Sequence, residues 1–420
     1  MKIIVQKYGG SSVATIEKLR SVARRVVETK QHGHAVVVVV SAMGNSTNEL
    51  VDLARQLSSD PSRRELDALL VTGEMVSMSL LAIAIQESGE DAIALNGLQC
   101  GILTNDVHSN AQILEVRPAR IRKHLERGEI VVVAGFQGFT SSGDLTTLGR
   151  GGSDTTAVAL AAALEAEHCE IYTDVAGVFT ADPRVVPQAR FLKELGAAEM
   201  QELAWTGAKV LKAGAVELAR ASGVSMVVRS TFEDGHDTWV HPHPKSEQTF
   251  RPSCTGVAGV SGRKDVIRIT LGLAECAHAS REAVFDLIAK YDLIFGETGN
   301  FSEPADILIS SLEIPAPAAF ARRLRDQFGD DITVADRLGM VSLVGFGLGS
   351  RPASFLDASG ILRQAQVPVV KSFTTRESLC FVVPVSRVNA SVALMHEAFI
   401  KESCGPPRHR GQQICDQAAT

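Results

Sequence analysis

The first half of the chain alternates between short apolar runs and longer segments whose apolar positions recur at helical spacing. The run AVVVVV at residues 35–40 has no polar position, which is typical of a strand buried on both faces. Four such runs predict strands, at residues 3–7, 35–40, 130–134 and 170–173. Four periodic segments predict helices, at residues 15–29, 66–86, 154–166 and 197–221. This alternation predicts right-handed βαβ crossovers, and therefore an α/β fold with a mostly parallel sheet sandwiched by helices.

A polar segment with three prolines, GHDTWVHPHPKSEQTFRPSC at residues 235–254, interrupts this pattern. Beyond it, two segments repeat one order of predicted elements, which is a strand, a helix and two strands, so we expect two related α+β modules. Their first strands are expected at 266–273 and 340–346, their helices from residues 279 and 353, and a last helix at 388–400. The expected division is an α/β domain at 1–235, a linker at 236–255, modules at 256–336 and 337–405, and a disordered tail at 406–420.

The composition is that of a soluble globular protein of 420 residues, with 45% hydrophobic and 21% charged residues. The net charge of −6 gives no indication of a nucleic-acid partner. No apolar run approaches the roughly 18 residues of a membrane span, and the N-terminus lacks a signal-peptide cleavage site, so no membrane association is expected. The seven cysteines are scattered without CxxC pairs, which favours free thiols in the reducing cytoplasm over a zinc site.

Two glycine clusters occur where predicted strands end, KYGGSS at residues 7–12 and GRGGSD at residues 149–154. Glycine at a strand-to-helix turn lets backbone N–H groups approach an anion, and the following helix adds its positive end. Lys7 adds a mobile cation that suits the transferring phosphate of a nucleotide. Gly-Gly turns also arise for packing reasons alone, and the clusters taken singly leave both interpretations open.

Three charged residues suggest how an amino acid could be held. Arg150 stands between glycines, and its planar fork matches a carboxylate, although a solvated loop arginine is the alternative. Asp154 could cap the following helix. Glu74 lies inside the apolar segment 69–85, where a buried carboxylate needs a partner. That partner is either a cationic group of a ligand or an internal lysine or arginine.

Further polar side chains follow predicted strands, at the edge of the sheet where open α/β folds bind ligands. Ser41 and Thr47 follow the strand 35–40, with turn and capping roles as the alternative. The segment EIYTDVAGVFTADPR at residues 170–184 could hold a ribose, phosphates and a metal through Thr173, Asp174, Asp182 and Arg184. Turn chemistry explains Asp182 with its following proline but not the whole set. Lys209 is expected near the start of a helix, where it could also be a plain surface lysine.

Taken together, these segments resemble the aspartate kinases (aspartokinases), enzymes with the amino-acid-kinase fold that open lysine, threonine and methionine synthesis. The resemblance rests on VQKYGGSSVA, VVVVVSAMGNSTNEL, LLVTGEMVSMSLLA, VAGFQGF, TTLGRGGSDTTAVALAAALEA, EIYTDVAGVFTADPRVVP and GAKVL, which occur in family order between residues 1 and 230. The second half resembles the tandem ACT modules of that family more loosely. The family therefore implies a homodimer, or a higher homo-oligomer, formed through these modules.

The resemblance implies transfer of the γ-phosphoryl group of ATP, carried with Mg2+, to the β-carboxylate of L-aspartate, giving 4-phospho-L-aspartate. No dedicated protein ligand for the metal is evident. The residues implied in catalysis are Lys7, Gly10, Arg150 and Asp154. Those implied in holding aspartate are Ser41, Thr47, Glu74, Arg150 and Ser153, with Arg150 on the α-carboxylate and Glu74 facing the amine or organising Lys7. Those implied in binding ATP are Lys7, Gly9, Gly10, Ser11, Thr173, Asp174, Phe179, Asp182, Arg184 and Lys209. Phe179 stands where the family usually has tyrosine.

The second half departs from the family pattern. The stretches GLAECAHAS at 272–280 and GSRPAS at 349–354 lack the Pro-Gly turns whose amides hold an effector carboxylate in this family. We therefore expect inhibition by lysine or threonine to be weak or absent. Two other functions remain open: an enzyme of this fold acting on another acidic amino acid, and a non-catalytic regulatory subunit. The second is disfavoured because Lys7, Glu74, Arg150 and Asp154 are all present.

Overall fold

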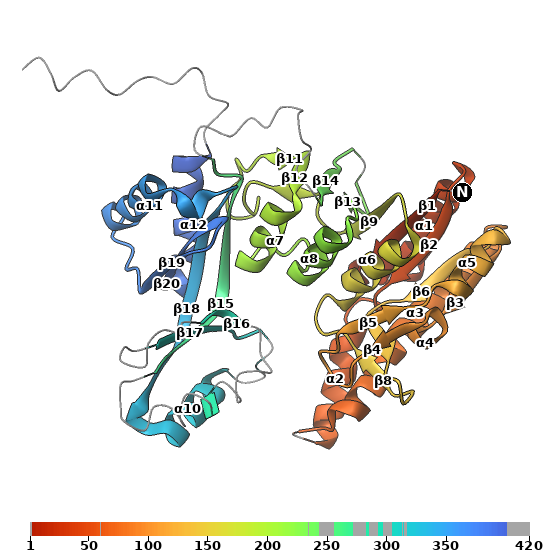
Figure 1. Ribbon diagram of the computed structural model, residues 1–420, viewed down its shortest axis with the longest axis horizontal. Helices are drawn as coiled ribbons and strands as arrows, with labels where there is room; N and C mark the ends of the chain where they lie inside the picture. Colours follow the sequence, from red (N-terminus) through yellow and green to blue (C-terminus); the bar gives the residue numbers. More distant parts are fainter. Residues whose placement is uncertain are drawn as a thin grey trace, which may run out of the picture. The chain divides into compact units, whose positions relative to one another are not determined.

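The computed structural model (Figure 1) describes residues 2–58, 60–233, 235–242, 256–271, 283–284, 293–296, 305–312, 314 and 317–400. The chain forms two compact units. The first comprises Met1–Phe179, Arg190–Ala204 and Lys209–Ser246, and the second comprises Thr180–Ala189, Trp205–Ala208 and Glu247–Thr420. The tail expected at 406–420 and most of the linker expected at 236–255 lie outside the described residues.

The first unit is built on an eight-stranded sheet in the order β12-β14-β13-β9-β1-β2-β6-β3. In that order the strands are Glu194–Gly196, Thr238–His241, Met226–Ser230, His168–Thr173, Ile3–Tyr8, Ala35–Val40, Ile130–Ala134 and Ala92–Leu95. Only β13 and β14 pair antiparallel, and the other described neighbours in this sheet are parallel. The predicted α/β fold with a parallel-rich sheet is confirmed.

Helices cover both faces of this sheet, as predicted. On one face α1 (Ile16–Gln31) and α3 (Arg63–Glu87) bury a core with the even-numbered valines of β2. On the other face α6 (Gly152–Leu164) lies against β1, β2 and β9, with α8 (Ala213–Ser222) beside it. Because β2 is buried on both faces, every one of its six residues is apolar.

The long helix α3 corrects one expectation from the sequence. Among the described residues it is the one helix that is long and apolar enough to cross a membrane, judged by length and composition alone. Half of its most apolar window is buried within the protein, where Met78, Leu81 and Ile85 belong to the core beneath the sheet. One side of the helix is thus packed in the core of the first unit, while Met75, Val76 and Ile83 are exposed.

A small second sheet carries the chain towards the second glycine cluster. Its order is β5-β4-β7-β8, with β4 at Ile102–Thr104, β5 at Ile113–Val116, β7 at Gln137–Phe139 and β8 at Leu145–Thr147. The hairpin of β7 and β8 ends three residues before Arg150, so the position of the hairpin determines where the loop that carries Arg150 starts.

The second unit contains a six-stranded sheet in the order β16-β17-β15-β18-β20-β19. The strands in that order are Leu293–Gly296, Ala305–Ser310, Gly259–Leu271, Ile332–Val344, Ser378–Pro384 and Lys371–Thr374, and all their pairings are antiparallel. Three apolar clusters include side chains of its strands, and two of them are covered by helices. One includes side chains of α10 (Pro317–Phe328), and the other includes side chains of α11 (Pro352–Gln364) and α12 (Val388–Phe399).

One predicted helix was wrong, and several helices were not predicted. The helix expected at 197–221 is two helices, α7 (Ala197–Thr206) and α8, because Gly207 has a φ of +128° and a side chain there would lie 2.8 Å from the carbonyl oxygen of Gly262. Lys209 consequently lies in the connecting loop and not at a helix start. The helices α2 (Ser46–Leu57), α5 (Ala119–Glu126) and α10 were not predicted. The start of the helix expected from residue 279 lies outside the described residues.

Candidate active site

The two glycine clusters meet through an ion pair between Lys7 and Asp154. Lys7 lies near the carboxyl end of β1, and Asp154 lies in the first turn of α6. The Lys7 Nζ atom is 2.6 Å from Asp154 Oδ1, and the two side chains are only 13% and 10% exposed. A Cβ atom on Gly9 would lie 3.7 Å from the same Nζ, so the ammonium group also lies over the first glycine of the cluster. A cation is thus held at the start of a helix and beside glycine backbone, as phosphate binding requires.

Gly10 brings this loop into direct contact with the loop that follows β2. A Cβ atom on Gly10 would lie 2.8 Å from the carbonyl oxygen of Ala42 and 3.2 Å from that of Gly44. The amide of Gly44 donates to the carbonyl of Gly10 at 3.0 Å, and the amide of Ser41 donates to the carbonyl of Tyr8 at 3.1 Å. Glycine is therefore needed at position 10 because two stretches of backbone nearly touch there.

Glu74 supplies a buried carboxylate close to these loops. It is 3% exposed, and its Oε1 atom accepts a hydrogen bond from the amide of Ala42 at 3.0 Å. Its Oε2 atom is buried and has no hydrogen-bond partner within the described part of the chain. Burial raises the pKa of Glu74 to about 7, and the hydrogen bond from Ala42 opposes that shift. A carboxylate in this state favours a cation that arrives with a ligand, and no lysine or arginine among the described residues forms an ion pair with it.

The loop around Arg150 has a conformation that its glycines allow. Gly149 and Gly151 have φ values of +70° and +71°, in the left-handed region that disfavours side chains. Arg150 between them is exposed, and Ser153 in the next turn is buried against Gly135, where a Cβ atom would lie 2.7 Å from the serine hydroxyl oxygen. The turn presents Arg150 outwards and leads directly into α6.

One cation beside this loop was missed by the sequence reasoning. A Cβ atom on Gly151 would lie 2.7 Å from the Cβ of Lys212, so the lysine stem packs on the glycine-rich loop. Lys212 precedes α8, and only its place at the end of the segment GAKVLK could have marked it.

The residues expected to hold the nucleotide are distributed more widely. The hydroxyl of Thr173, at the end of β9, donates to Asp174 at 3.1 Å. The ring of Phe179 packs edge-on against that of Phe191, with centroids 5.7 Å apart. Asp182 and Arg184 form a two-bonded ion pair with each other, at 2.8 and 3.0 Å, and belong to the second unit.

The remaining predicted residues lie near the first two loops. Ser11 is in the short helix η1 (Gly10–Val13), and its carbonyl accepts from the Lys18 ammonium at 2.9 Å. Ser41 accepts a hydrogen bond from the Ser77 hydroxyl of α3 at its carbonyl oxygen, at 2.8 Å. Thr47 lies in the first turn of α2 (Ser46–Leu57). The contacts thus link the Lys7 cluster to Asp154, at the end of the Arg150 loop, and through Gly10 and Ala42 to Glu74. A cation, a buried acid and an exposed arginine on these linked loops fit an anionic phosphate and a small zwitterion.

Comparison with known proteins identifies relatives over almost the whole chain. Residues 2–230 match the sequence model of the Amino acid kinase family. An aspartokinase of Geobacillus stearothermophilus is 43% identical over 405 residues, which cover 95% of this chain and 97% of the relative. Aspartokinase 2 of Bacillus subtilis is 40% identical over 95% of this chain and 98% of the relative.

Solved structures show the same fold. E. coli aspartokinase III in complex with aspartate and ADP (R-state) matches with a TM-score of 0.80 over 95% of this chain and 100% of that chain, at 24% identity. Aspartate kinase from Synechocystis matches with a TM-score of 0.54 at 38% identity, over 96% of this chain and 70% of that chain.

Proposed function

Because this chain belongs to the aspartokinases of the amino acid kinase family, we propose that Lys7, Glu74 and Arg150 hold its two substrates in line for phosphoryl transfer. The chain is an aspartate kinase, as the resemblance predicted. In its reaction a β-carboxylate oxygen of L-aspartate forms a bond to the γ-phosphorus of ATP while the bond from that phosphorus to the β,γ-bridging oxygen breaks. The bonding electron pair leaves with ADP, and the product is 4-phospho-L-aspartate.

The reaction needs positioning and charge neutralisation more than acid–base chemistry. A carboxylate is already ionised at neutral pH, so no general base has to remove a proton from the nucleophile. The negative charge spread over the transferring phosphoryl oxygens needs fixed donors and cations. Lys7 and the amides around Gly9, Gly10 and Ser11 supply them, and Asp154 holds the Lys7 ammonium at 2.6 Å.

The α-amino acid part of aspartate fits the other two charged groups. Arg150 forms the two-bonded pair with the α-carboxylate that its guanidinium geometry favours. Glu74 accepts the α-ammonium at the oxygen that has no partner within the described residues. Ser41, Thr47 and Ser153 line the space between them. The unpartnered, buried oxygen of Glu74 is the observation that carries this assignment, because a buried acid without a cation is costly.

The nucleotide is assigned to the opposite side of Lys7. Thr173 and Asp174 at the end of β9 contact the ribose and phosphates, with Phe179 and Lys209 of the same unit completing the site. Mg2+ bound with ATP would neutralise part of the charge on its phosphates.

We assign the second unit to the ACT-like modules and to self-association. The proposal of two modules, at 256–336 and 337–405, is supported by two helix-covered cores, one with α10 and one with α11 and α12. A further apolar cluster joins residues of both expected modules, so their sheet is continuous. The enzyme acts in the cytoplasm as a homodimer or higher homo-oligomer in the aspartate pathway, which leads to lysine, threonine and methionine. Ala353 stands where the family turn has glycine, and the other divergent stretch, at 272–280, lies outside the described residues. Activity measured with millimolar lysine, threonine or both should change less than twofold, and strong inhibition would contradict this assignment.

The direct test is a hydroxamate assay with ATP, Mg2+ and L-aspartate. Hydroxylamine traps the acyl phosphate itself, so a coloured hydroxamate reports the acyl phosphate product rather than mere ATP hydrolysis. A parallel panel scored by ADP release should include L-glutamate and β-alanine. We expect L-aspartate to be preferred over both, and preference for another acid would replace the substrate assignment. Arg150→Ala should weaken aspartate binding far more than β-alanine binding, because β-alanine has no α-carboxylate.

A further inference from the structure

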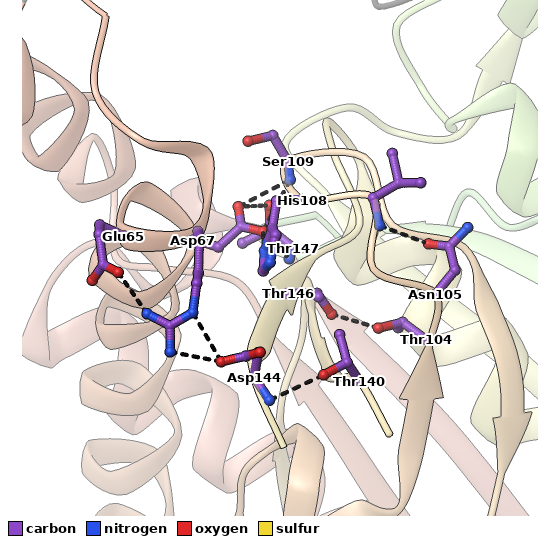
Figure 2. Close-up of polar contacts among 12 residues, drawn as sticks. Glu65, Asp67, Thr104, Asn105, His108, Ser109, Thr140, Asp144, Thr146 and Thr147 are labelled. Carbon is purple, nitrogen blue, oxygen red and sulfur yellow. Dashed lines mark hydrogen bonds and ion pairs between the residues drawn. The ribbon is translucent and has the colours of Figure 1, made fainter. Parts of the chain in front are cut away.

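A buried carboxylate outside the residues assigned so far joins three segments of the first unit. Asp67 lies early in α3 and is fully buried. Its two oxygens accept hydrogen bonds from the Thr147 hydroxyl at 2.7 Å, the Thr147 amide at 3.1 Å and the Ser109 amide at 2.9 and 3.2 Å. The Nδ1 atom of His108 lies 3.0 Å from Oδ2. Figure 2 shows these partners gathered around the one carboxylate.

This arrangement fixes the local backbone tightly. A buried acid is tolerated when its oxygens are fully hydrogen-bonded, and bonds to a charged acceptor are about twice as strong as neutral ones. Two of the donors of Asp67 are main-chain amides, from residues 109 and 147. Because the donors are main-chain amides, the carboxylate fixes the backbone at residues 109 and 147 and not only their side chains.

The partners of Asp67 frame the glycine-rich loop. Thr147 is the last residue of β8 and stands three residues before Arg150. The amide of Ala111 donates to the carbonyl of Thr147 at 2.8 Å, and a Cβ atom on Gly149 would lie 2.8 Å from the Asn110 side-chain oxygen. The start of the loop that presents Arg150 is thus held on both sides by segments bonded to Asp67.

The same helix carries the other residue that holds aspartate. Glu74 is seven residues after Asp67 on α3, which is two turns or about 10 Å along the helix. One rigid element therefore anchors the Arg150 loop at one point and presents Glu74 at another. We propose that Asp67 is a positioning residue that fixes Arg150 relative to Glu74 and so sets the affinity for the amino-acid substrate. This inference rests on the proposed function of Arg150 and Glu74.

The chain offers a matched control in Asp144. This residue immediately precedes β8 and accepts two hydrogen bonds from Arg64, in the first turn of α3, at 2.9 and 2.6 Å. It therefore links the same helix to the same strand, but at the end of β8 away from Arg150, and its side chain is 31% exposed. Figure 2 shows both acids beside β8. A general effect of loosening α3 from β8 would appear in Asp144→Asn as well.

The experiment compares Asp67→Asn, Thr147→Val and Asp144→Asn in the full chain. Asp67→Asn should raise KM for L-aspartate by on the order of tenfold or more, since small misplacements of a positioning group are costly. KM for ATP should stay within about twofold of the parent value under the same reasoning, since the nucleotide residues are not attached to this carboxylate. Thr147→Val removes one hydroxyl bond and should give a smaller change in the same direction. Asp144→Asn should leave KM for L-aspartate and KM for ATP unchanged.

If Asp67→Asn does not fold, Thr147→Val carries the test alone. The inference is overturned if the folded variants keep the parent KM for aspartate, or if both KM values rise together. A double-mutant cycle adds an independent readout. In an Arg150→Ala background, Asp67→Asn should have little further effect on KM for aspartate, because the group it positions is gone. If the effects of Arg150→Ala and Asp67→Asn on KM for aspartate simply add, the positioning role of Asp67 is contradicted.

The two proposals fail in distinguishable ways. Absence of hydroxamate from the parent enzyme, or an unchanged KM for aspartate in Arg150→Ala, would contradict the proposed function. A normal Asp67→Asn variant beside an impaired Arg150→Ala variant would contradict only the positioning role.

Discussion

The ammonium of Lys7 lies 2.6 Å from the carboxylate of Asp154, and this pair joins the end of β1 to the start of α6. Both side chains are about nine-tenths buried, so the ammonium is held in place and its charge is only weakly screened by water. The same pair brings together the two glycine clusters, which are far apart in the sequence. Lys7 therefore joins two loops, and in the proposed function it also supplies the positive charge that a transferring phosphoryl group needs.

Replacing Lys7 by methionine should separate these two purposes. The methionine side chain keeps much of the apolar stem but not the charge, so kcat should fall on the order of a thousandfold, as when one preorganised donor to a developing charge is removed. Removing one member of a largely buried ion pair should also cost roughly 3 kcal/mol in the free energy of unfolding. Steady-state ADP release and urea denaturation measure the two effects.

The double variant Lys7→Met with Asp154→Asn provides the control for stability. Without the unpaired acid it should regain much of the lost free energy of unfolding but none of the lost kcat. Recovery of activity in the double variant would show that Lys7 acts only by neutralising Asp154.

Gly9 and Gly10 form a matched pair for testing backbone approach. A methyl group on Gly10 would meet the Ala42 carbonyl oxygen at 2.8 Å, whereas one on Gly9 would be in ordinary contact with the Lys7 ammonium at 3.7 Å. We expect Gly10→Ala to cost about 1–3 kcal/mol in stability and to reduce kcat strongly, since two loops must move apart. Gly9→Ala should stay close to the parent in thermal denaturation. Equal losses of stability in Gly9→Ala and Gly10→Ala would contradict the close approach of Gly10 to the Ala42 carbonyl.

Much of the first unit could be predicted from the sequence because its signals are local. A β-branched run such as residues 35–40 has few alternatives to a buried strand, and the glycine clusters near Lys7 and Arg150 mark turns between a strand and a helix. The break between α7 and α8 could not be predicted, because it depends on the carbonyl of Gly262, more than fifty residues beyond Gly207 along the chain. The role of Asp67 was missed for the same reason, since its partners come from two distant segments and the residue itself looks like an ordinary helix aspartate.

Ser109 provides a test of local strain near the Asp67 cluster. It has a φ of +70°, and its hydroxyl oxygen is buried without a hydrogen-bond partner in the described part of the chain. Both features cost free energy, so Ser109→Gly should raise the free energy of unfolding by about 1 kcal/mol while keeping the amide that donates to Asp67. Urea denaturation measures the change. A loss of stability would mean that the serine side chain has a favourable contact that outweighs the strain.

Glu74 should make the stability of the enzyme depend on pH in a defined direction. Its pKa is raised by burial from 4.5 to about 7, so the folded state binds more protons than the unfolded state between these values. Stability should therefore fall as pH rises through this window, with a cost that is absent below about pH 4.5 and reaches roughly 3 kcal/mol above about pH 7. Glu74→Gln removes the titration. Its free energy of unfolding relative to the parent should be about 2 kcal/mol more favourable at pH 8 than at pH 5, and a difference that does not vary with pH would contradict the raised pKa.

Aspartate binding should then expel a proton from the same site. In the free enzyme at pH 7 about half of the Glu74 side chains are protonated, given the pKa of about 7. An α-ammonium placed against the carboxylate favours its charged form and lowers its pKa, so binding should release about half a proton per aspartate at this pH. Calorimetric titrations in phosphate and in Tris measure this release, because the apparent enthalpy changes with the ionisation enthalpy of the buffer. Glu74→Gln, measured at concentrations that allow for weaker binding, should give the same enthalpy in both buffers. A parent enzyme that releases no proton would mean that the ammonium of aspartate binds elsewhere.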